Sequence, residues 1–99
     1  IHQPITASLT AAGEEALSGN WNRAQWLCAG AEQFWKEKAL FRSCFADHNP
    51  VEEIDGAFKL LQIYCSAREQ ISFSGGCLQL ARQVAAVGEA HELVWWNLL

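Results

Sequence analysis

The segment Asp47–Ile54 constrains the fold most strongly, because it ends one apolar pattern and begins another within a few residues. Asn49 is a suitable N-cap, and Pro50 suits the first helical position because it has no N–H to leave unpaired. The acidic residues Glu52 and Glu53 interact favourably with the positive end of a helix dipole. A connection this short makes the flanking helices antiparallel neighbours, so the sequence predicts a helical bundle.

Periodic apolar residues predict four helices, over approximately residues 3–17, 21–46, 51–66 and 70–98. Between the first two, Gly19 is a natural C-terminal cap and Asn20 can cap the helix that follows. No Asn-Gly or Asp-Gly hairpin turn and no sustained alternation of polar and apolar residues indicates strands. We predict an all-α fold, a single domain over residues 1–99 that forms an antiparallel up-down four-helix bundle of two stacked hairpins.

Each predicted helix carries an apolar stripe that we expect to face a shared core. The stripes of the first three helices are Ile5, Leu9, Ala12 and Ala16; Ala24, Leu27, Cys28, Ala31, Phe34, Trp35, Lys38, Phe41 and Phe45; and Val51, Ile54, Ala57, Phe58, Leu61, Tyr64 and Cys65. The core prediction is wrong if Phe34, Phe58 and Leu78 lie in water.

The fourth helix has two interpretations, because Gly75 and Gly76 interrupt its pattern. In one, the chain breaks near Arg68 and a helix runs continuously from Gln70, with the glycines at a close helix crossing. In the other, the break falls at residues 72–76, since two helical glycines cost about 2 kcal/mol relative to alanine. We favour the continuous helix, because one stripe spans the region: Ile71, Ser74, Leu78, Ala81 and Ala85.

Composition narrows the classes of function. The 99 residues include 51% apolar ones, enough to build one core, and carry a net charge of −4. The seven basic residues are scattered, whereas binding to a phosphate backbone needs a concentrated positive surface, so we expect no nucleic acid partner. No phosphate-binding loop, nucleophile elbow or His-Glu-x-x-His motif is present, and we therefore expect neither an enzyme nor a cofactor.

Two histidines form the candidate metal site. His48 and His91 lie near the ends of the second and fourth predicted helices, which an up-down bundle brings to the same pole, near Glu52. Bundle metal sites use Glu-x-x-His, however, and His91 follows Glu89-Ala90. We favour a structural role at the helix ends and keep a metal- or ligand-binding bundle as the alternative.

The four cysteines, Cys28, Cys44, Cys65 and Cys77, form no Cys-x-x-Cys motif, which excludes zinc-ribbon and thioredoxin-like sites. The antiparallel arrangement places Cys28, Cys65 and Cys77 toward one pole. A disulfide between Cys65 and Cys77 is open to the chain in an oxidising compartment, although free thiols are favoured.

The tryptophans are the strongest indication of a role beyond folding. Trp95 and Trp96 are adjacent, so they cannot both face one core, and Trp21 and Trp26 widen the apolar face of the second helix. Exposed aromatic side chains mark partner surfaces. These four tryptophans define the candidate interaction surface, for a protein partner or for self-association; the alternative is that they only build a wide core between short helices.

Several segments together resemble an uncharacterised Firmicutes family of short helical proteins. The matching features are Gly19-Asn20-Trp21-Asn22-Arg23-Ala24, Trp35, the Asp47-His48 turn followed by Val51-Glu52-Glu53-Ile54-Asp55, the apolar ladder to Tyr64, and Asn97-Leu98-Leu99. The family is a domain of unknown function that usually follows an N-terminal membrane segment. The resemblance implies an anchored, extracytoplasmic helical domain and implies no activity.

The first residue, Ile1 rather than Met, also indicates an excised fragment that lacks such an upstream segment. No run of 18 apolar residues is present in the sequence, so contact with a membrane is expected only through that segment. We therefore predict a non-enzymatic interaction or scaffold module, anchored in the membrane in its full-length form.

Overall fold

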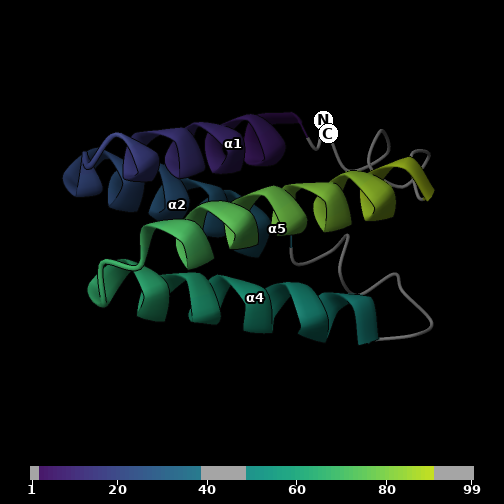
Figure 1. Ribbon diagram of the computed structural model, residues 1–99. Helices are drawn as coiled ribbons and strands as arrows, with labels where there is room; N and C mark the ends of the chain where they lie inside the picture. The colour runs from purple at the N-terminus through teal and green to yellow at the C-terminus, as the bar shows by residue number, and fades with distance from the viewer. Residues whose placement is uncertain (1–2, 39–48, 91–99) are drawn as a thin grey trace.

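The computed structural model describes residues 3–38 and 49–90, and these form four α-helices (Figure 1). They are α1 (Gln3–Leu17), α2 (Trp21–Lys36), α4 (Asn49–Ser66) and α5 (Gln70–Ala90). No strand occurs in either described range. The predicted all-α four-helix bundle is confirmed.

The four helices run alternately in opposite directions, as Figure 1 shows. α1 and α2 form one hairpin, and α4 and α5 form the other. α1 packs extensively against both α2 and α5, and α4 packs against α5. The contact between α2 and α4 is the sparsest of the four seams. The bundle is therefore tight around α1 and loosest between α2 and α4.

Both hairpin turns use the same helix-ending motif. After α1, the N–H of Gly19 bonds to the carbonyl of Ala16 and the N–H of Asn20 bonds to that of Glu15. This pattern is a Schellman motif, and Gly19 takes the left-handed conformation that it requires, with φ 81°. Asn20 then caps α2, since its side chain accepts a hydrogen bond from the N–H of Arg23 at 3.4 Å. The predicted Gly19–Asn20 joint is confirmed.

The second turn places Arg68 in the left-handed conformation, with φ 59°. The N–H of Arg68 bonds to the carbonyl of Cys65, and that of Glu69 bonds to Tyr64. Arg68 thus occupies the position where glycine is usual, although a side chain there carries a backbone cost of roughly 1–2 kcal/mol. The predicted break near Arg68 is confirmed.

The core contains the stripes expected for the first three helices. The buried members are Ile5, Leu9, Ala12 and Ala16 of α1, Ala24, Cys28, Ala31 and Trp35 of α2, and Ile54, Phe58, Leu61 and Cys65 of α4. Phe34 and Tyr64 are partly buried and pack against this cluster. The spacing of three and four residues therefore identified the inward face of three helices correctly.

The predicted inward face of α5 is wrong by about one residue position. Ile71 is 80% exposed and Leu78 is 49% exposed, so neither belongs to the core. The buried residues are Phe73, Cys77, Leu80, Ala81 and Val84, of which Ala81 belongs to the predicted stripe. Two close approaches fix the orientation of α5 about its own axis: Gly76 lies against Leu61 of α4, and Cys77 lies against Gly13 of α1.

Two predicted boundaries also change. α2 ends at Lys36 rather than at residue 46, and the N–H of Lys38 bonds to the carbonyl of Trp35, which tightens the last turn. The stripe positions Phe41 and Phe45 lie outside the described residues. α4 begins at Asn49, two residues before the predicted start.

The continuous α5 helix is confirmed, with Gly75 and Gly76 in its interior. The two glycines have different surroundings. A Cβ on Gly76 would lie 2.8 Å from Cδ2 of Leu61, whereas a Cβ on Gly75 would have no neighbour within 4 Å. Gly76 is therefore needed for the close crossing of α4 and α5, and Gly75 is not.

This contrast gives a matched pair of variants. Gly75→Ala should raise the free energy of unfolding by about 1 kcal/mol, because alanine favours a helix over glycine. Gly76→Ala gains the same preference but must displace the buried Leu61, so it should be less stable than Gly75→Ala by about 1–3 kcal/mol. Urea unfolding followed by circular dichroism measures both. Equal stabilities would contradict the close crossing.

Candidate functional site

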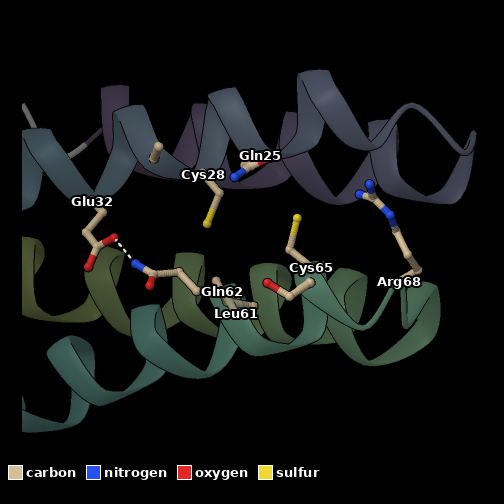
Figure 2. A pocket seen from close by; sticks show the side chains of 9 residues that line it. Gln25, Cys28, Glu32, Leu61, Gln62, Cys65 and Arg68 are labelled. Atoms are coloured by element: carbon tan, nitrogen blue, oxygen red, sulfur yellow. Dashed lines mark hydrogen bonds between the residues drawn. The ribbon is translucent and has the colours of Figure 1, made fainter.

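A cleft of about 490 Å³ opens between α2 and α4, along the loosest seam of the bundle (Figure 2). α2 contributes Gln25, Cys28 and Glu32 to its walls, and α4 contributes Leu61, Gln62 and Cys65. Arg68, from the turn after α4, lies at one end. The cleft thus combines polar groups at its rim with two thiols on opposite walls.

The antiparallel register of α2 and α4 brings the two thiols together. The side chain of Gln62 donates a hydrogen bond to Glu32, which links the two walls. From this pair, Cys28 lies about one turn back along α2 and Cys65 about one turn forward along α4. Because the helices are antiparallel, both steps lead in the same direction, and Figure 2 shows both sulfur atoms projecting into the cleft.

The three described cysteines are buried and carry free thiols. Cys77 does not line the cleft, but it is close enough to Cys28 and Cys65 for each to affect its ionisation. The predicted gathering of Cys28, Cys65 and Cys77 is therefore seen. The free thiols describe the reduced form, and the Cys65–Cys77 disulfide stays a prediction. Gly76 faces Leu61, about one turn from Cys65, so the register does not place Cys77 directly opposite Cys65.

Burial keeps the thiols of Cys28 and Cys77 protonated. The pKa of Cys28 is raised to about 12, mainly by desolvation and further by the negative charges of Glu32 and Cys65. The pKa of Cys77 is also raised to about 12, mainly by desolvation and further by the negative charges of Cys28 and Cys65. A nucleophilic cysteine needs the opposite shift, because the thiolate is the reactive form. The environment of Cys28 and Cys77 thus opposes nucleophilic catalysis at neutral pH.

Polar contacts hold the two walls of the seam in place. The indole N–H of the buried Trp35 donates a hydrogen bond of 2.7 Å to Oδ1 of Asp55, which joins α2 to α4. Glu32 also pairs with Lys36 at 3.5 Å. At the other end, the Arg68 guanidinium lies 5.5 Å from the ring centroid of Trp21. The cleft is therefore bordered at each end by contacts between elements.

A second feature lies on the outer side of α2. Trp26 is 67% exposed, and it lines a shallow groove with Leu27, Gly30 and Phe34 of α2 and Pro4 and Ser8 of α1. We call these residues the aromatic face. The guanidinium of Arg23 lies 5.6 Å from the Trp26 ring, and the amine of Lys38 lies 4.7 Å from the Phe34 ring. This surface is apolar and aromatic with cations at its edges.

The predicted site residues fall into three groups. Trp26 is strongly exposed, whereas Trp21 is partly buried and packs edge-to-face on Phe73 at 5.5 Å. Glu52 is exposed in the first turn of α4. The remaining candidates, His48, His91, Trp95 and Trp96, lie outside the described residues. Within residues 3–38 and 49–90, no three His, Cys, Asp or Glu side chains converge closely enough to hold a metal ion.

The sequence did not indicate the cleft itself. Cys28 and Cys65 were expected as buried members of their stripes, but nothing in the spacing showed that their seam would remain open. Arg68 was expected only at a break in the chain. Its place at the end of the cleft depends on the left-handed turn, which the residue type does not predict.

Fold and site together define a small helical-bundle domain with a cleft between α2 and α4. The chain belongs to the family described as a domain of unknown function, DUF4363, whose model matches residues 1–98. This confirms the expected membership of an uncharacterised family. Searches of curated proteins and of solved structures find no match. Among the described helices, none is both long and apolar enough to cross a bilayer.

The raised thiol pKa values predict how stability depends on pH. Between the ordinary thiol pKa of 9.0 and about 12, the unfolded chain loses protons that the folded domain keeps on Cys28 and Cys77. The free energy of unfolding should therefore fall as pH rises from 9 toward 12. Urea unfolding at several pH values measures this slope. A Cys28→Ala/Cys77→Ala double variant should show a shallower slope, and an unchanged slope would contradict the assignment.

Proposed function

We propose that this domain is a non-enzymatic interaction module that binds a protein partner through the aromatic face. The exposure of Trp26 carries the proposal, because 67% of this large apolar side chain faces water on a helix whose other face is packed into the core. Tryptophan is among the residues most enriched at the energetic centres of protein interfaces. The partner is another protein or a second copy of this chain.

The surroundings of Trp26 support this assignment. Its groove of about 490 Å³ gives an apolar side chain of a partner a place to enter. The guanidinium of Arg23 lies over the Trp26 ring and the amine of Lys38 lies over the Phe34 ring. Arg23 also pairs with Glu15 of α1 at 3.6 Å. An apolar centre with a charged rim is the usual anatomy of a protein interface.

The absence of catalysis is part of the same proposal. Burial raises the pKa of Cys28 and Cys77, which is unfavourable for a nucleophile. The carboxylate of Glu32 in the cleft is already paired with Lys36 and Gln62. The alternative metal- or ligand-binding role of His48 and His91 stays a prediction, since both lie outside the described residues.

We also propose that the full-length protein presents this domain on the extracytoplasmic face of a membrane through an N-terminal anchor. The support is the resemblance of the Gly19–Ala24 joint and the Val51–Asp55 segment to a family that usually carries such a segment. In that setting the aromatic face is available to partners at the cell surface.

A photo-crosslinking amino acid in place of Trp26 tests the interaction. In cells that express the full-length protein, illumination should give a discrete adduct, identified by mass spectrometry as a partner or as a second copy. The same amino acid in place of Glu53, exposed on α4, is the matched control and should give none. Equal labelling from both positions, or none from Trp26, would contradict the aromatic face as the interface.

Fractionation of cells tests the anchor separately. The full-length protein should remain with membranes after a high-salt wash, and external protease should digest this domain in intact protoplasts. A full-length reading frame with no hydrophobic segment before Ile1, or a protein protected from external protease, would show that the anchoring proposal is wrong.

A further inference from the structure

The cleft between α2 and α4 contains a pair of donors that the interaction proposal does not use. Cys28 and Cys65 project their sulfur atoms into it from opposite walls (Figure 2). Both are free thiols, and each helix holds its cysteine on the buried stripe. The open side of the cleft gives small solutes a route to the two sulfurs.

The chemistry of the cleft selects one class of ligand. The cysteine and acidic side chains that line it are Cys28, Cys65 and Glu32, and the carboxylate of Glu32 is held by Lys36 and Gln62. Thiolate sulfur favours soft metal ions over hard ones. Within residues 3–38 and 49–90, no third His, Cys, Asp or Glu completes a set of three, so these residues offer the ion two sulfur donors. Monovalent d¹⁰ ions accept two donors, because they form linear complexes with two thiolates.

We propose that the α2/α4 cleft binds a single Cu(I) ion between Cys28 and Cys65. Binding forms two Cu–S bonds and breaks two S–H bonds, so that Cu⁺ and two thiols give a bis-thiolate complex of charge −1 and two protons released to water. No electron is transferred. The side chain of Arg68, at the end of the cleft, supplies a positive charge that offsets the negative charge of the complex.

A cation between the two sulfurs attracts both thiolates, so metal binding and loss of the two thiol protons occur together. Since binding displaces two protons, the apparent affinity should rise about 100-fold for each unit of pH in the neutral range.

Titration of the reduced domain tests the site. Under anaerobic conditions with ascorbate, the protein should remove one equivalent of Cu(I) from its coloured complex with bicinchoninate. Cys28→Ala and Cys65→Ala should each weaken binding at least about 100-fold, since one donor of two is lost. Cys77→Ala, Cys44→Ala and Trp26→Ala are matched controls and should bind as the parent does. Zn(II), which prefers four ligands, should not displace Cu(I).

Three results would overturn the two-thiol site. They are full copper binding by Cys28→Ala or Cys65→Ala, equal weakening of copper binding by Cys77→Ala, and displacement of Cu(I) by Zn(II). Circular dichroism checks that each variant is folded. X-ray absorption on the parent protein gives a second readout that needs no variant: two sulfur neighbours around copper support the proposal, and three or more contradict it.

Discussion

The size of the side chains at each seam sets the spacing of the helices, and the rest of the structure follows from that spacing. Helix axes approach only as closely as the residues between them allow. α1 presents Ala12, Gly13 and Ala16, and a Cβ on Gly13 would already lie 3.4 Å from Cys77 of α5. The seam between α2 and α4 instead contains long side chains such as Trp35, and its helices touch least. Small residues therefore close one side of the bundle, and large ones hold the other side open.

The open seam explains why buried thiols and a cleft occur together. Cys28 and Cys65 occupy stripe positions where a leucine would fill the space between the helices. Cysteine is smaller, so the space remains. The two walls do not collapse onto it, because the hydrogen bond between Trp35 and Asp55 and the one between Gln62 and Glu32 hold them at a fixed distance. Burial between the helices also removes the Cys28 thiol from water, and this desolvation raises its pKa.

The sequence predicts the helices well because their signals lie within short segments of the chain. It predicts the site poorly because the site depends on the distance between packed helices. The stripes of α1, α2 and α4, the Gly19–Asn20 joint and the continuous α5 follow from periodicity and caps. The inward face of α5 does not, since stripes through Ile71 and through Phe73 both have helical spacing. Only contact with Leu61 and Gly13 decides between them. Likewise no Gly or Pro marks the end of α2 at Lys36, and the apolar pattern continues past it.

Arg68 links the turn chemistry to the cleft. The two hairpins end with the same hydrogen-bond pattern, but one uses Gly19 and the other Arg68 at the left-handed position. The backbone cost at Arg68 is offset only by what its side chain contacts. Its guanidinium lies over Trp21, and the Trp21 ring packs on Phe73 at the start of α5. A glycine at this position would relax the backbone but remove both that contact and the positive charge at the end of the cleft. Arg68 therefore has two roles: it takes the left-handed position that ends α4, and its side chain lines the end of the cleft.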